Sequence, residues 1–197
     1  MPASRSLSVL REAATACHGC DLYLRATQVV FGAGSRRASM MLIGEQPGDK
    51  EDIEGKPFVG PAGAMLQRAL DAAGLKADAI YVTNAVKHFS WEPRGKRRIH
   101  KKPRASEIRA CRPWLEAEIE AVQPAVIVCL GATAAQALLG AGFKLTAKRG
   151  QPVPSPFARA VVATIHPSSI LRAPDPEGRH AAFEGLVADL RTAAALL

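Results

Sequence analysis

Polar side chains of catalytic and ligand-binding types follow three of the apolar segments in this sequence. Glu45 and Gln46 come directly after a run of four apolar residues. Asn84 lies near the end of a second apolar run, and His166 directly follows a third. A carboxylate, two amides and an imidazole can accept, donate and transfer protons. If the runs are parallel strands, their carboxyl ends meet at one edge of a sheet, which is where ligands bind in such folds.

The first of these runs opens into a twenty-residue loop, 44–63, with the composition of a binding site. Its five Gly and three Pro suit a backbone that turns sharply and approaches a ligand closely. It also carries five acids, among them Asp49, and one aromatic residue, Phe58. An ordinary connection takes only about 4 to 6 residues, so we expect a functional loop. The alternative is a solvated loop in which Phe58 fills the core.

The segments that would position these groups alternate between strand and helix patterns. Strands are predicted at 40–43, 79–86, 125–130 and 160–165, and helices at 6–16, 63–73, 105–121, 132–139 and 179–195. The segment 29–35 is either an edge strand or an irregular loop. Apolar strands that alternate with helices imply βαβ units and a parallel sheet covered on both faces. We therefore predict a single domain over residues 1–197, with an α/β fold: a three-layer α/β/α sandwich around a central, largely parallel four-stranded sheet.

The composition indicates a folded, basic protein. The chain is 48% hydrophobic, and 26 Lys and Arg against 18 Asp and Glu give a net charge of +8, which points to an anionic partner such as nucleic acid. No apolar run approaches the roughly 18 residues of a membrane span. Residues 1–10 also lack the apolar core of a signal peptide. We expect a cytoplasmic protein with no membrane partner.

Four cysteines are the candidates for metal ligation. Cys17 and Cys20 are separated by two residues, and Cys111 and Cys129 by 17. In a reducing compartment such thiols suggest ligation before disulfides. Zinc ribbons present two close pairs, so the wide second spacing favours a 4Fe–4S cluster over zinc. Alternatively, Cys111 and Cys129 are unreactive core thiols.

The segment 87–104 is predicted to be a basic loop, with eight Lys or Arg and a single acid, Glu92. Because it follows the strand that carries Asn84, it would overhang the same sheet edge and meet DNA phosphates there. The ordinary alternative is a solvated loop. The candidate DNA contacts are Lys87, Lys96, Arg97, Arg98, Lys101 and Lys102, together with Ser168 beside His166.

Several of these segments resemble motifs of one enzyme family. The loop 44–63 resembles the first motif of the iron-sulfur (family 4) uracil-DNA glycosylases, 82–87 the second motif and 166–168 the last. The four cysteines resemble the family's cluster ligands. The Glu45-Gln46 pair, together with 96–100 (Lys-Arg-Arg-Ile-His), is similar to the narrower UdgX subgroup, which becomes covalently trapped on uracil-containing DNA. The resemblance runs in the expected order from Cys17 to His166.

The resemblance implies that uracil-containing DNA is the partner and free uracil a product, and we expect a monomer. The Asn84 amide would complement the Watson–Crick edge of uracil and mismatch cytosine twice. Phe58 would stack on the flipped base. His166 would stabilise the negative charge of the departing base in an oxocarbenium-like transition state. Gln46 and Asp49 complete the expected uracil-binding set.

The catalytic set that the resemblance implies is Glu45, Gln46, His100 and His166. His100 would capture the sugar C1′ after uracil leaves. The 4Fe–4S cluster, held by the four cysteines, would tie the N-terminal turn to the sheet. Two alternatives remain at this stage: a glycosylase that turns over, in which His100 only contacts DNA, and a non-catalytic iron-sulfur module that binds nucleic acid.

Overall fold

A computed structural model describes residues 2–4 and 6–197 of the chain. Its central sheet has six strands in the order β1-β3-β2-β6-β8-β7. In that order their bounds are Ala33–Gly34, Ile80–Asn84, Met40–Gly44, Val126–Leu130, Ala158–Thr164 and Pro152–Ser155. The four inner strands run parallel, whereas β1 and β7 pair antiparallel at the two edges. The predicted α/β fold with a largely parallel sheet is confirmed, with six strands in place of four.

The two edge strands account for the difference in strand number. β1 contains only two residues, so the segment 29–35 is mostly irregular, as one of its two predicted alternatives allowed. β7 begins at Pro152 and also contains Pro154. Proline removes a donor from the hydrogen-bond ladder and is confined to edge positions, which is why this segment lacks the signature of a central strand.

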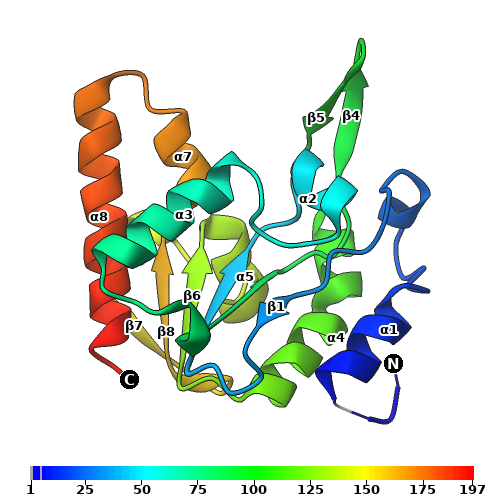
Figure 1. The fold of residues 1–197 in the computed structure, drawn as a ribbon, viewed down its shortest axis with the longest axis horizontal. Coiled ribbons are helices and arrows are strands. Elements are labelled where there is room, and N and C mark those ends of the chain that lie inside the picture. Colours follow the sequence, from blue (N-terminus) through cyan, green and yellow to red (C-terminus); the bar gives the residue numbers. More distant parts are fainter. Residues whose placement is uncertain (1, 5) are drawn as a thin grey trace.

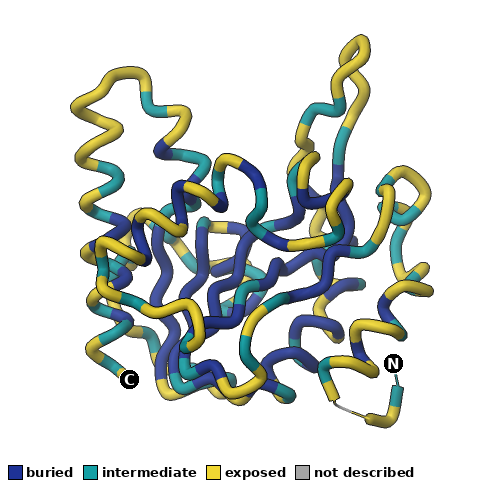
Figure 2. The backbone as a smooth tube through the Cα atoms, viewed as in Figure 1, coloured by how far each residue is buried: buried dark blue, intermediate teal, exposed yellow. Residues whose placement is uncertain are grey.

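Helices cover both faces of the sheet (Figure 1). Side chains alternate along β2, so that Met40 and Leu42 face one helical layer and Met41 and Ile43 the other. The first layer contains α3 (Pro61–Ala72), α7 (Pro167–Leu171) and α8 (Pro176–Ala194). The second contains α4 (Ala105–Val122) and α5 (Ala132–Leu139), with α1 (Leu7–Ala14) packed on α4 through a third apolar cluster. Figure 2 shows the strands as the most buried part of the chain.

Two projections rise beside the carboxyl ends of the parallel strands (Figure 1). One is the connection between α7 and α8. The other is a hairpin of β4 (Trp91–Arg94) and β5 (Arg97–His100), which turns at Gly95 with a φ of 59°. The segment 87–104, predicted as a basic loop, therefore contains a hairpin that the sequence did not indicate. Figure 2 shows the hairpin tip as exposed.

Shorter elements complete the chain. The predicted site loop contains a helix, α2 (Asp49–Glu54), and α6 spans Leu145–Lys148. Two 3-10 turns cover Asp21–Leu24 and Ala77–Ala79. No helix in the described part of the chain is long and apolar enough to cross a membrane.

Candidate active site

A cavity of about 710 Å³ lies at the carboxyl edge of the sheet. Its wall is formed by the segments that follow β2, β3, β6 and β8 and by the end of the hairpin. The predicted site residues that line it are Glu45, Gln46, Asp49, Phe58, Asn84, His100, Lys102, His166 and Ser168. Residues far apart in the sequence are therefore brought to one concave site, as expected for the edge where parallel strands end.

The Asn84 amide lies at the end of β3, directly opposite Gly44 of β2. A Cβ atom at position 44 would overlap the Asn84 Oδ1 and lie 2.8 Å from the Phe58 Cζ, so a glycine is required for this close approach. Phe58 has a φ of 57°, unusual for a bulky residue. Its carbonyl packs on Gly63, where any Cβ would overlap it. No described residue hydrogen-bonds the Asn84 amide, which is accessible from the cavity.

His166 precedes the first turn of α7 and is held by Ser168. Its Nδ1 accepts the Ser168 backbone N–H at 3.2 Å and lies 2.7 Å from the Ser168 Oγ. Since Nδ1 is an acceptor, the neutral ring carries its proton on Nε2. Burial, with the nearby charges of Arg172 and His100, lowers the pKa of His166 to about 4. The ring stacks on Phe58 with centroids 6.4 Å apart. His166 is therefore a neutral hydrogen-bond donor at physiological pH.

His100 ends β5 and meets Glu45 at the cavity. Its Nε2 lies 3.5 Å from the Glu45 Oε1, and the two side chains are 51% and 22% exposed. The pairing of an exposed imidazole with a carboxylate orients the ring and provides a group that can take its proton. This contact joins the end of the hairpin to the predicted catalytic carboxylate that follows β2.

Gln46 fastens the base of the hairpin. Its amide nitrogen donates to the carbonyls of Ser90 at 3.1 Å and Lys101 at 3.0 Å, and its oxygen accepts the Ser90 N–H at 3.0 Å. Both amide donors of Gln46 are thus occupied by the backbone on either side of β4 and β5. Gln46 lines the cavity, but its observed contacts position the hairpin that carries His100.

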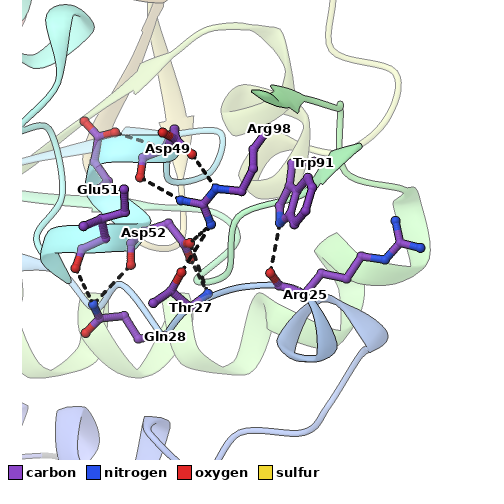
Figure 3. A network of polar contacts seen from close by, with 10 residues as sticks. Arg25, Thr27, Gln28, Asp49, Glu51, Asp52, Trp91 and Arg98 are labelled. Atoms are coloured by element: carbon purple, nitrogen blue, oxygen red, sulfur yellow. Dashed lines mark hydrogen bonds and ion pairs between the residues drawn. The ribbon is translucent and has the colours of Figure 1, made fainter. Parts of the chain in front are cut away.

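Arg98 fastens the same hairpin to α2 (Figure 3). Its Nε donates to Asp49 and its Nη1 to the fully buried Asp52, both at 2.6 Å. The guanidinium also lies over the rings of Phe89 and Trp91, 5.5 and 5.6 Å from their centroids. The guanidinium is paired with these carboxylates but is still 22% exposed, so the predicted contact of Arg98 with DNA stays a prediction.

The prediction that Lys87 contacts DNA was wrong. The Lys87 side chain is only 1% exposed and forms an ion pair with the buried Glu118 of α4. It cannot reach a phosphate without unfolding this part of the structure. In contrast, Lys96, Arg97 and Lys101 are exposed on the hairpin and the residue after it.

The four predicted cluster ligands do not lie together. Cys17 and Cys20 lie near Cys111 of α4. Burial is the main cause that raises the pKa of Cys111 to about 12, and the two neighbouring cysteines raise this pKa further. Cys129 lies instead within β6, in the apolar core between the sheet and α4 and α5. The prediction of Cys129 as a ligand was therefore wrong, because a central strand keeps its side chain in the core.

No three His, Cys, Asp or Glu side chains among the described residues converge in a group that could hold a metal ion. A four-cysteine cluster therefore does not fit this arrangement. A buried imidazole, His88, was missed by the sequence analysis. It follows Lys87, whose backbone N–H donates to the Cys111 Sγ at 3.2 Å, and burial lowers its pKa. Its position next to the second motif was the available signal.

Two further parts of the cavity wall are Glu51, one of the acids of the predicted functional loop, and the start of α5, which was not predicted to line the cavity. Glu51 joins the ends of the site loop, since its carboxylate accepts the backbone N–H groups of Gly60 at 2.7 Å and Gly48 at 3.2 Å. The start of α5, at Gly131 and Thr133, also lines the cavity. The signal for α5 was its place directly after a predicted strand.

Comparison with known proteins agrees with this geometry. Residues 31–191 match the model of the uracil DNA glycosylase superfamily. The chain is 35% identical over 181 residues to a type-4 uracil-DNA glycosylase of Thermotoga maritima, covering 91% of each protein. It is 34% identical over 178 residues to the type-4 enzyme of Sulfurisphaera tokodaii, covering 86% of this chain and 78% of the relative. It is 40% identical over 120 residues to that of Archaeoglobus fulgidus, covering 61% and 57%. On this match and this site, the chain belongs to the uracil DNA glycosylase superfamily.

Proposed function

We propose that this protein excises uracil from DNA and that His100 then captures the sugar, as in the UdgX subgroup. The observation that carries the proposal is the contact of His100 with Glu45 at the mouth of a cavity that also holds Asn84, Phe58 and His166. Binding of DNA phosphates by a basic hairpin does not by itself require an imidazole beside a carboxylate of the cavity. The family match supports excision, and the His100 geometry supports capture.

Uracil is read by Asn84 in this proposal. The amide oxygen accepts the uracil N3–H, and the amide NH2 donates to O4. Cytosine presents an acceptor and an amino group at the same positions, so both contacts would oppose like groups. Phe58, held beside Gly44, supplies the ring on which the flipped base stacks, a contact worth about 1 to 3 kcal/mol.

Excision breaks the bond between the base nitrogen and C1′, and the electron pair leaves with uracil. The charge that develops on uracil is stabilised by the Nε2–H of His166, which is neutral because of its lowered pKa. A nitrogen of His100 then supplies the electron pair for a new bond to C1′. Glu45 accepts the ring proton or stabilises the positive ring. A held imidazole has a large effective-concentration advantage over water.

Asp49 is a second carboxylate at the cavity. One of its oxygens accepts Arg98, and its side chain is half-exposed. In the proposal its other oxygen contacts the base or an attacking water. The DNA backbone lies along the hairpin and contacts Lys96, Arg97, Lys101 and Lys102, with Ser168 on the opposite wall of the cavity.

The proposal includes a 4Fe–4S cluster with a changed ligand set. Cys17, Cys20 and Cys111 would supply three thiolates, and His88, which follows the Lys87 whose backbone N–H donates to the Cys111 Sγ, would be the fourth ligand. These four side chains do not converge in this structure, so binding a cluster would require them to move together. Imidazole replaces thiolate in some iron-sulfur centres. The cluster's contribution would be structural, because it would join the turn after α1 to α4 and to the segment that follows β3.

The experiment is incubation of the wild-type protein with a uracil-containing oligonucleotide, with assays for free uracil and for an SDS-resistant adduct. We expect one uracil released per protein and an adduct in equal amount. His100→Ser should abolish the adduct and still release uracil. Release over many turnovers without an adduct would favour an ordinary turnover glycosylase. If no uracil is released, the proposed activity is refuted.

A further inference from the structure

The ammonium group of Lys87 is buried directly beneath the end of β3. All three of its N–H donors are used: it donates to the Thr83 Oγ1 at 2.7 Å, to the backbone carbonyl of Asn84 at 2.7 Å, and to the Glu118 carboxylate. Lys87 is 1% exposed and Glu118 is fully buried. A buried ammonium group is stable in a folded protein only when all of its N–H donors are hydrogen-bonded in this way.

Glu118 projects from α4 and accepts further hydrogen bonds on the same face of this strand. Its Oε1 accepts the Gly32 N–H at 2.8 Å and the Tyr81 hydroxyl at 2.9 Å. Its Oε2 accepts the Thr83 hydroxyl at 2.9 Å and Lys87. The network thus holds β3 through Tyr81 and Thr83, which precede Asn84 on this strand.

The peptide unit that follows Asn84 is held on both sides. Its carbonyl accepts Lys87 Nζ, and its N–H, that of Ala85, donates to the Gly44 carbonyl at 2.9 Å. Together these bonds set the backbone of Asn84 and hence the direction in which its side chain leaves the strand. Stability alone does not call for a charged pair here, because apolar replacements of buried ion pairs are often neutral or stabilising.

We propose that Lys87 and Glu118 are positioning residues that hold the Asn84 amide in the orientation needed to read the base. This inference rests on the proposed function, in which Asn84 recognises uracil. A site built to hydrogen-bond one base edge needs that amide held closely, because a displacement of about 1 Å can cost roughly 100-fold in rate. The buried pair contacts Asn84 through its backbone and leaves the side-chain amide open to the ligand.

The test measures single-turnover uracil release by Lys87→Met/Glu118→Gln, which removes both charges together. We expect a loss of about 100-fold, similar to the loss for Asn84→Ala. The decisive protein is the triple variant with Asn84→Ala added. If the pair acts through Asn84, the triple variant is no slower than Asn84→Ala, because effects on one shared element are not additive. Losses that multiply would overturn the proposal.

Two controls separate positioning from general destabilisation. Leu115→Ala, which removes a fully buried side chain from the same helix, should lower the unfolding midpoint but leave the rate of the folded protein unchanged. Thr83→Val keeps both charges but removes the bridging hydroxyl, so it replaces the double variant if that protein does not fold. It should slow release, and its effect should also vanish when Asn84→Ala is present.

Failure of the proposed function can be distinguished from failure of this inference. If the wild-type protein releases no uracil, the activity is wrong, and the Asn84 side-chain amide signals in nuclear magnetic resonance spectra become the readout. Broadened or shifted signals in the Lys87 and Glu118 variants, but not in Leu115→Ala, would still support positioning. Unchanged signals would refute it.

Discussion

Replacing Arg98 by Met should separate sugar capture from uracil excision. Arg98 holds the hairpin against α2 through Asp49 and Asp52 and stacks on Trp91 (Figure 3). His100 lies two residues further along β5, so its place at the cavity depends on this docking. Asn84, Phe58 and His166 come from other elements and should remain in position.

The size of the effect follows from the burial of the two carboxylates. Without Arg98, the fully buried Asp52 carboxylate keeps only one partner among the described residues, the Thr27 N–H at 3.0 and 3.1 Å. Breaking a buried pair in this way costs about 3 to 5 kcal/mol, whereas the half-exposed Asp49 contact adds at most about 1 kcal/mol. Since Gln46 still holds the hairpin base, we take about 3 kcal/mol as the loss of docking, or roughly 100-fold in the rate of capture.

The assay is a single-turnover reaction in which free uracil and SDS-resistant adduct are measured from the same samples. Arg98→Met should keep uracil release within a few-fold of wild type while adduct formation falls by roughly 100-fold. Arg97→Met is the matched control, because it removes an exposed cation from the neighbouring position of β5. Adding Asp52→Asn should restore stability but not capture. An unchanged ratio of adduct to uracil in Arg98→Met would refute the docking argument.

Three further predictions concern other contacts. Gln46→Glu should slow adduct formation, because a carboxylate replaces two N–H donors that face backbone carbonyls, at a cost of about 3 kcal/mol. Hydrogen exchange of the hairpin amides should accelerate in this variant, and exchange as slow as in the wild type would contradict the role of Gln46 in holding the hairpin. Cys129→Ala should retain the iron content of anaerobically purified protein, whereas Cys111→Ala should lose it; equal iron in both would remove Cys111 from the ligand set. The pKa of His166 is lowered to about 4, so the unfolded chain binds more protons than the folded protein between pH 6.5 and 4, and stability falls as the pH drops through that window. Titration of His166 by nuclear magnetic resonance should give a midpoint near 4, which should rise in Arg172→Gln. A midpoint near 6.5 would contradict the burial argument.

Much of the site could be predicted because it depends on strand ends. Once the apolar runs are recognised as parallel strands, Glu45, Asn84 and His166 must share one edge. The Gly and Pro content of the loop around Phe58 likewise predicts a tight turn that approaches a ligand. The local sequence pattern therefore predicted the fold class and the site residues that lie at strand ends.

The partners of individual side chains were not predictable in the same way. Lys87 and Arg98 belong to one basic segment, and charge alone placed both on DNA. In the structure both turn inward, Lys87 to Glu118 and Arg98 to Asp52, because long cationic side chains reach acids that distant elements bring near. The sequence shows the charge of a residue but not the direction of its side chain.

The alternation of strands and helices, the polar groups that end the strands and the superfamily motifs can all be read from the amino-acid order. Which cysteines are neighbours, that the basic segment forms a hairpin, and that His100 meets Glu45 emerge only when the chain is folded. The difference is one of range. Strand and helix patterns arise from side chains a few residues apart, whereas these contacts join segments whose proximity depends on the strand order β1-β3-β2-β6-β8-β7 and on the packing of α4.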